Sequence, residues 1–245
     1  MLKHGREVYK SRCLGCHGAK GDGRGPAAKF LDPKPRDFTS GIFKFKSTPN
    51  EALPTDSDMM RVLSMGVMGT SMPSFRLLPE TSKYAVVQYI KTFSDEWKKK
   101  ENVMPRIQGA PFPRKDFLNH GKFVARAKQG RKIYKENCLT CHGRSGMGDG
   151  EGGQDLTDDW DNPVKPGNLT LPKIKTGKSV RDIYLALLTG RAGTPMPSFK
   201  DALSDTELWD VTAYVLYLRG LTAGVYEGMK SPPLPEITKQ EEEAL

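Results

Sequence analysis

The chain has 245 residues, of which 37% are hydrophobic and 27% charged, and its formal net charge at pH 7 is +9. This length suits two small domains, and the four cysteines are too few for a small disulfide-stapled fold. No run of about 18 apolar residues occurs, so we expect no transmembrane segment. No nucleic-acid motif accompanies the basic charge, so we expect no nucleic-acid partner and favour an acidic protein partner.

The first expected helix, residues 2–14, leads into Cys13–His17, which reads Cys-Leu-Gly-Cys-His. A second, residues 121–139, leads into Cys138–His142, which reads Cys-Leu-Thr-Cys-His. This pentapeptide is the attachment signature of c-type haem: the thiols add to vinyl groups and the histidine supplies an axial nitrogen. Helical positions i, i+3 and i+4 also share one face. We therefore predict two covalently bound haem c groups, on Cys13, Cys16 and His17 and on Cys138, Cys141 and His142.

Three other uses of the cysteines fit the sequence less well. A zinc site usually closes a compact loop, whereas about 120 residues separate the two cysteine pairs. A thioredoxin-like redox pair needs a strand before the motif, and a helix-like run precedes it here both times. A disulfide framework needs a higher density of cysteine.

Two further helices are expected in each half of the chain, connected by long loops rich in Gly and Pro. They cover residues 56–65 and 79–97 in the first half and residues 179–188 and 205–219 in the second. Thr55 is a plausible start for the first short helix, and Thr176 or Ser179 for the second. Ser204 and Glu207 have the spacing of a capping box. No alternating strand pattern occurs, so we expect an all-α fold.

The two halves follow one plan, which makes the chain an internal repeat. Residues 5–13 match residues 130–138 at an offset of 125. Further matches pair Gly-Asp-Gly at 21–23 with 148–150, residues 35–39 with 166–170, and Gly-Thr-X-Met-Pro-Ser-Phe at 69–75 with 193–199. The near-constant offsets mean that the two copies differ by small loop changes.

The repeat singles out two of the ten methionines. Met65, Met68 and Met72 all lie in a suitable loop of the first copy, but only Met72 has a methionine, Met196, at the matching position. In the class I cytochrome c family, which this chain resembles, a loop methionine is the second axial ligand, and its soft thioether stabilises ferrous iron and raises its potential. The resemblance therefore implies Met72 and Met196 as the axial ligands opposite His17 and His142. The remaining methionines of this region are expected to fill gaps in the core: Met59, Met60, Met65, Met68 and Met147.

This pattern resembles the class I cytochrome c family, with two of its domains in tandem over most of the chain. In that family an N-terminal helix ends in the haem motif, a C-terminal helix crosses it, and a loop between them carries a methionine ligand. Its N-terminal helix places Gly, an aromatic residue and the first Cys at four-residue steps, as do Gly5, Tyr9 and Cys13 here. The resemblance implies a close helix crossing at Gly5 and at Gly130.

The resemblance also implies a proline carbonyl that holds the Nδ1–H of the axial histidine, supplied by a Gly-Pro pair after the motif. Gly25-Pro26 fits this role in the first copy. The second copy has Gly152-Gly153 in that region and no proline before Pro163. His4 and His120 have no counterparts in the other copy, so we expect them on the surface.

We expect a first domain in residues 1–100, a linker in 101–120, a second domain in 121–220 and a Pro-rich tail in 221–245. The first residues lack the apolar stretch of a signal peptide. Because the resemblance implies haem attachment outside the cytoplasmic membrane, we expect a periplasmic or otherwise exported protein whose signal was removed.

The two halves differ in charge. Residues 1–107 carry 19 basic and 11 acidic residues, whereas residues 108–245 carry 19 and 18. The basic residues of the first haem loop are Lys20, Arg24, Lys29, Lys34, Arg36, Lys44 and Lys46; the acidic ones of the second are Asp149, Glu151, Asp155, Asp158, Asp159 and Asp161. We hypothesise that the first haem docks on an acidic partner and that the second faces a different, less acidic one. Arg36 is a candidate partner of a haem propionate, and the alternative is an exposed arginine.

The expected function is that of a diheme electron carrier. Two irons closed by His and Met would cycle between ferric and ferrous states and move single electrons between respiratory redox partners, without enzyme activity. The alternative is a diheme enzyme of the peroxidase or thiosulfate-oxidising type, which needs one exchangeable haem ligand.

Overall fold

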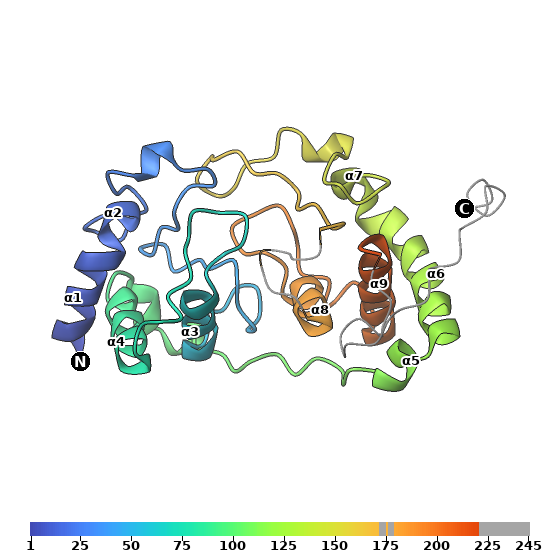
Figure 1. Ribbon diagram of the computed structural model, residues 1–245, viewed down its shortest axis with the longest axis horizontal. Helices are drawn as coiled ribbons and strands as arrows, with labels where there is room; N and C mark the ends of the chain where they lie inside the picture. The colour runs from blue at the N-terminus through green and yellow to red at the C-terminus, as the bar shows by residue number, and fades with distance from the viewer. Residues whose placement is uncertain (172–174, 176–178, 221–245) are drawn as a thin grey trace. The chain divides into compact units, whose positions relative to one another are not determined.

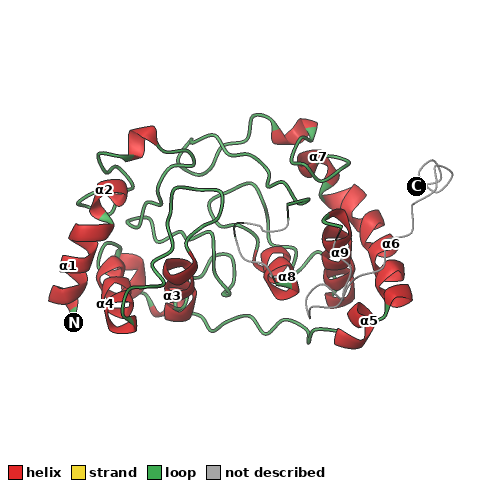
Figure 2. Ribbon diagram, in the orientation of Figure 1, coloured by secondary structure: helices red, strands yellow, loops and turns green. Residues whose placement is uncertain are grey.

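The computed structural model describes residues 1–171, 175 and 179–220, and the regular elements of these residues are helices (Figure 2). Within them, extended backbone pairs only at an isolated antiparallel bridge between Thr157 and Pro163. The all-α prediction is confirmed. The expected tail and the expected helix start at Thr176 lie outside the described residues. No described helix combines the length and the apolar character needed to cross a membrane.

The chain forms two compact units. Unit 1 contains Met1–Gln108 together with Thr157–Val164 and Thr189–Ser198. Unit 2 contains Gly109–Leu156, Lys165–Leu188 and the described residues from Phe199 onward. Two segments of the second half of the chain therefore belong to unit 1, a feature with no signal in the repeat pattern.

Unit 1 is built on a crossing of its first and last α-helices, which lie side by side (Figure 1). Its helices are α1 (Leu2–Arg12), α2 (Leu14–His17), α3 (Asp56–Met65) and α4 (Glu80–Lys91), with 3₁₀ turns at Ala28–Phe30, Asp95–Lys98 and Lys100–Asn102. A Cβ at Gly5 would overlap the carbonyl oxygen of Ala85, so only glycine allows α1 to approach α4 this closely. The predicted role of Gly5 is confirmed.

The predicted helix 79–97 is shorter in the structure, because α4 ends at Lys91. The hydroxyl of Thr92 donates to the carbonyl of Tyr89 at 2.6 Å and so gives one of the last carbonyl groups of the helix a hydrogen-bond partner. A separate 3₁₀ turn then begins where the side chain of Ser94 accepts the amide hydrogen of Glu96.

Unit 2 repeats the same crossing with its own pair of long helices. Its helices are α5 (Arg114–Leu118), α6 (His120–Asn137), α7 (Leu139–His142), α8 (Val180–Thr189) and α9 (Asp205–Leu218), with a 3₁₀ turn at Glu151–Gly153. Here a Cβ at Gly130 would overlap the carbonyl oxygen of Asp210, which confirms the close helix crossing predicted at Gly130. Helix α5 was not predicted; it forms within the stretch expected to be a linker.

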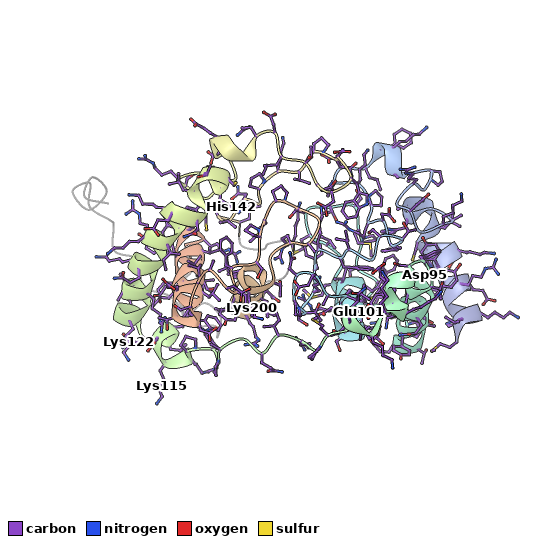
Figure 3. All side chains as sticks on the ribbon, turned by 180° about the vertical axis from the view of Figure 1, so that it is seen from behind. Asp95, Glu101, Lys115, Lys122, His142 and Lys200 are labelled. Carbon is purple, nitrogen blue, oxygen red and sulfur yellow. The ribbon has the colours of Figure 1, made fainter. Side chains whose placement is uncertain are left out.

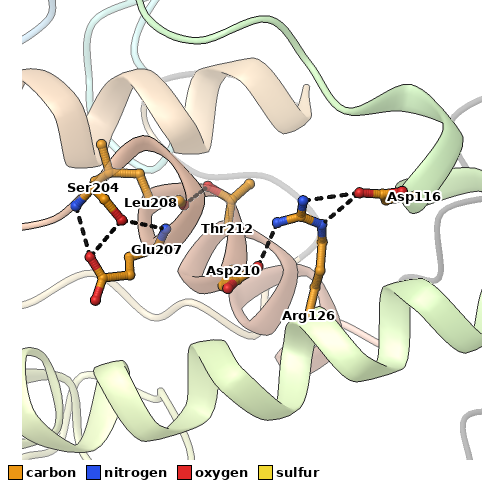
Figure 4. A network of polar contacts seen from close by, with 7 residues as sticks. All are labelled: Asp116, Arg126, Ser204, Glu207, Leu208, Asp210 and Thr212. Carbon is orange, nitrogen blue, oxygen red and sulfur yellow. Dashed lines mark hydrogen bonds and ion pairs between the residues drawn. The ribbon is translucent and has the colours of Figure 1, made fainter.

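A polar network fixes α9 against its neighbours (Figure 4). Ser204 and Glu207 form the predicted capping box, in which the Ser204 amide donates to Glu207 at 2.8 Å. Arg126 of α6 donates to Asp210 at 2.6 Å and to Asp116 of α5 at 2.9 Å. Burial raises the pKa of Asp210, and the guanidinium of Arg126 opposes that shift. One arginine thus joins three helices.

Candidate haem sites

Both Cys-X-X-Cys-His motifs form a helical turn at the end of a longer helix. In the first, the amides of Cys16 and His17 donate to the carbonyl of Cys13 at 3.1 and 2.9 Å. In the second, the amides of Cys141 and His142 donate to the carbonyl of Cys138 at 3.3 and 2.8 Å. This turn places the three ligand side chains of each motif on one face, as the spacing predicts.

The four cysteines are free, with Cys13 buried and the other three partly buried. Burial, reinforced by the neighbouring cysteine of each motif, raises the pKa of Cys13 to about 11 and that of Cys138 to about 12. A reactive redox pair needs the opposite, a lowered thiol pKa. In the part of the chain that the structure describes, no cluster of three or more His, Cys, Asp or Glu side chains could hold a metal ion. The raised thiol pKa values do not support the thioredoxin-like interpretation.

A backbone carbonyl orients each motif histidine. The Nδ1 atom of His17 lies 3.0 Å from the carbonyl oxygen of Arg36, and Nδ1 of His142 (labelled in Figure 3) lies 3.0 Å from that of Gly167. A carbonyl only accepts, so each Nδ1 carries the hydrogen and each Nε2 keeps its lone pair. Burial lowers the pKa of both histidines, which favours the neutral ring. Both histidines therefore fit the role of an axial ligand to haem iron.

The predicted source of this carbonyl is wrong. The carbonyl of Pro26 was expected to accept the hydrogen of His17, but the acceptor is the carbonyl of Arg36, ten positions further along the chain. Gly25 instead serves close packing, because a Cβ there would lie 2.6 Å from the carbonyl oxygen of Leu14. The correct signal was the repeat of residues 35–39 in residues 166–170, which aligns Arg36 with Gly167.

Gly150 is the structural counterpart of Gly25, since their amides donate to the carbonyls of Cys141 and Cys16, the second cysteines of the two motifs. The offset of 125 therefore continues past the motifs. The predicted match of the two Gly-Asp-Gly triplets has an offset of 127, so it is two residues out of register with the structure. The second copy is then six residues longer between Gly150 and Pro166 than the first is between Gly25 and Pro35.

The two methionine loops share one hydrogen-bonded turn. The carbonyl of Met72 accepts the amide hydrogen of Val67 at 3.1 Å, and the carbonyl of Met196 accepts that of Arg191 at 3.0 Å. Met72 packs against the buried cluster of unit 1 that contains Cys13 and Phe38. The ring of Phe38 stacks on His17 with centroids 4.5 Å apart. Three predicted residues of the first haem site, Cys13, His17 and Met72, therefore lie around one apolar cluster.

Met196 lies in a segment of unit 1, whereas His142 lies in unit 2, and its ligation of the second iron stays a prediction. The expectation that the other methionines fill the core is wrong for three of them. Met65, Met68 and Met147 are 47%, 37% and 55% exposed. Their exposure follows from their loop and helix-end positions.

Two tyrosines whose role at the sites was not predicted stabilise the motifs. The hydroxyl of Tyr9 donates to the carbonyl of Gly18 at 2.8 Å, and that of Tyr134 donates to Gly143 at 2.7 Å. Burial raises the pKa of both hydroxyls. Each bond fixes the glycine that directly follows a motif histidine.

Several side chains of the predicted basic surface are engaged inside unit 1. Lys46 is 6% exposed and donates to the carbonyls of Asn50 and Ala52, and burial lowers its pKa to about 8. Lys44 lies 3.6 Å from Asp158. Arg36 is half-buried, while Lys20, Arg24, Lys29 and Lys34 are exposed. The basic surface is smaller than expected. His4 and His120 are exposed, as predicted.

Known proteins match both halves of the chain. Residues 2–94 match the cytochrome c family, and residues 125–215 match cytochrome C oxidase, cbb3-type, subunit III. The chain is 26% identical over 220 residues to the Cbb3-type cytochrome c oxidase subunit FixP of Azorhizobium caulinodans, covering 88% of this chain and 59% of that protein. It therefore spans little more than half the length of this curated relative.

Among solved structures, the chain is similar to a chain of the Kuenenia stuttgartiensis reducing HAO-like protein complex Kustc0457/Kustc0458. The TM-score is 0.81 and the identity 40%, over 88% of this chain and 96% of that chain. Each of the two matched family ranges contains one Cys-X-X-Cys-His motif.

Proposed function

The chain belongs to the tandem diheme cytochrome c family, and on that premise we propose that it is an electron carrier with two His/Met-ligated haems. As a member of this family it is a c-type cytochrome of electron transfer with covalently bound haem c. We propose specific residues as the ligands of each iron, and we propose that the chain catalyses no reaction of its own.

In this proposal Cys13 and Cys16 attach the first haem, and His17 and Met72 close its iron. The second haem is attached and closed by the matching residues, Cys138, Cys141, His142 and Met196. When bound, haem iron supplies one-electron exchange between its ferric and ferrous states. The carbonyl groups of Arg36 and Gly167 keep a hydrogen on Nδ1 of each histidine, which leaves Nε2 free to bind.

The observation that carries the proposal is the shared turn of the two methionine loops. Beyond the carbonyl bonds of Met72 and Met196, the hydroxyls of Thr70 and Thr194 each donate to a carbonyl of the same turn at 2.7 Å. A ligand loop built alike in both copies supports two closed irons. A peroxidase-type enzyme would need one iron with an exchangeable sixth position.

Spectroscopy of the full-length holoprotein tests this ligation. We expect the oxidised protein to show the far-red iron–thioether band at two-haem intensity, with no high-spin signal. Met72→Ala and Met196→Ala should each remove about half of the band. Met68→Ala is the matched control, since Met68 lies in the same loop with its side chain exposed. A high-spin haem in the unaltered protein, or rapid cyanide binding to one haem, would instead favour the enzyme.

We further propose that the protein works in an exported compartment between respiratory redox proteins, and that unit 1 docks on an acidic partner. The exposed basic residues Lys20, Lys29 and Lys34 support this, because such charges steer an oppositely charged partner at low salt. Replacing all three by Glu should slow reduction by the donor at low salt and have little effect at high salt. Equal rates at low salt would refute the docking site.

A further inference from the structure

The loop Thr157–Val164 is a self-contained turn that unit 1 takes from the second half of the chain. Its Asp158 side chain accepts the amide hydrogens of Trp160 and Asn162 at 3.1 and 3.0 Å. The bridge between Thr157 and Pro163 closes its base. The loop lies in the interval that is six residues longer in the second copy than in the first.

The tryptophan of this loop covers a charge beside the first haem site. The guanidinium of Arg36 stacks on the ring of Trp160, with Cζ 4.4 Å from the ring centroid. The same ring packs on Gly193, where a Cβ would lie 2.8 Å from Trp160 Cζ3. The amide of Asp159 donates to the carbonyl of Gly193 at 3.2 Å, which holds the loop there.

The residues that match Arg36 and Gly193 in the opposite copy of the repeat do not form such a stack. Gly167 stands at the position of Arg36, and a Cβ there would meet no atom within 4 Å. Gly69 stands at the position of Gly193 and is also open, although its φ of 69° is nearly the same as 73° at Gly193. The stack of Arg36 on Trp160 is therefore specific to the first haem site.

Arg36 links this stack to the iron ligand, because its carbonyl accepts the Nδ1–H of His17. Burial lowers the pKa of Arg36 to about 10, which Asp158, Asp37 and Asp159 oppose. The ring of Trp160 covers one face of its guanidinium, and the Arg36 side chain is half-buried. A positive charge with little water around it acts over a longer range and favours the reduced, less positive iron.

We propose that Trp160 is a positioning residue of the first haem, which excludes water from the Arg36 guanidinium and so raises the reduction potential of the iron bound by His17. A loop from the second half of the chain then sets the potential of the first haem alone. This inference rests on the proposed ligation by His17 and Met72.

A double-mutant cycle on the full-length holoprotein tests the inference by potentiometric titration. Arg36→Gln should lower the potential of the first haem and leave that of the second unchanged. In a Trp160→Ala background the same substitution should give a clearly smaller shift, because water already screens the charge. Trp160→Phe, which keeps an aromatic face, should restore most of the shift.

A second route removes dependence on the Trp160→Ala variant. Gly193→Ala displaces the Trp160 ring and should also reduce the shift caused by Arg36→Gln. Gly69→Ala is the comparison, since it carries the same backbone strain in open space within the Met72 turn; only a reduction of the shift beyond that seen with Gly69→Ala supports the role of Trp160. An exposed cation–aromatic pair, Lys29 on Phe30, is the control for the pairing of Arg36 with Trp160; its Nζ lies 4.8 Å from the ring centroid. Substitutions of Lys29 and Phe30 should change the potential of the first haem additively.

The outcomes separate this inference from the proposed function. A wild-type protein without the His/Met signature at the first haem would refute both. With that signature present, an equal Arg36→Gln shift in both backgrounds, or equal shifts at both haems, would refute the role of Trp160 and leave the electron-carrier function intact.

Discussion

Replacement of Gly130 by Ala should destabilise unit 2, because the added methyl group has no room between α6 and α9. A Cβ there would overlap the carbonyl oxygen of Asp210 and lie 2.9 Å from the amide nitrogen of Val211. Both are backbone atoms of a buried helix and cannot rotate away. In an open helical position the same change would stabilise by about 1 kcal/mol through helix propensity.

The magnitude follows from these opposing effects. Overpacking of this kind costs about 1–3 kcal/mol, and occasionally more, because the helices must separate. We expect the Gly130→Ala protein to lose up to about 2 kcal/mol of unfolding free energy after the gain in propensity. A loss of 1.4 kcal/mol raises the unfolded fraction about tenfold.

Gly121→Ala on the same helix is the matched control, since the nearest atom to its Cβ would be Oδ1 of Asn119 at an ordinary 3.6 Å. It should be neutral or stabilising by up to about 1 kcal/mol. Urea unfolding of both holoproteins, followed by far-ultraviolet circular dichroism, gives the difference. If the Gly130→Ala protein were as stable as the Gly121→Ala protein, the close crossing would be refuted.

Two further predictions concern buried polar groups. Tyr134→Phe leaves the carbonyl of Gly143 without its donor and should cost about 1–3 kcal/mol in urea unfolding, whereas Tyr84→Phe at a 43% exposed position should change little. Equal effects would contradict this role of the hydroxyl. Since the pKa of Lys46 is about 8 in the folded chain against 10.5 for an ordinary lysine, the unfolded chain binds more protons between these pH values. The unfolding free energy should therefore rise with pH across that interval, and Lys46→Met should remove this rise in a pH series of urea titrations; an unchanged rise would refute it.

The features that the sequence predicted correctly depend on short spacings. The two haem motifs, the capping box at Ser204 and the start of α6 all rest on residues within a few positions of one another. Gly5 and Gly130 were also found, because a glycine at a fixed distance from each motif marks a helix crossing. Helix propensity and side-chain spacing along one helix are local properties.

The errors concern contacts between distant segments. Pro26 was the nearer candidate for the carbonyl that holds His17, yet Arg36, nineteen positions from the histidine, supplies it. Lys46 was assigned to a basic surface, but carbonyls of its own loop enclose it. Composition cannot distinguish a solvated lysine from a buried one, because burial depends on how the loop folds back.

The sequence by itself therefore determined the two haem motifs, the repeat and the helices that carry them. Only the tertiary structure decided which carbonyl orients each histidine and which half of the chain covers Arg36. The stack of Arg36 on Trp160 joins residues 124 positions apart. No local spacing encodes such a pair, since it forms when the loop Thr157–Val164 of the second copy packs on a loop of the first.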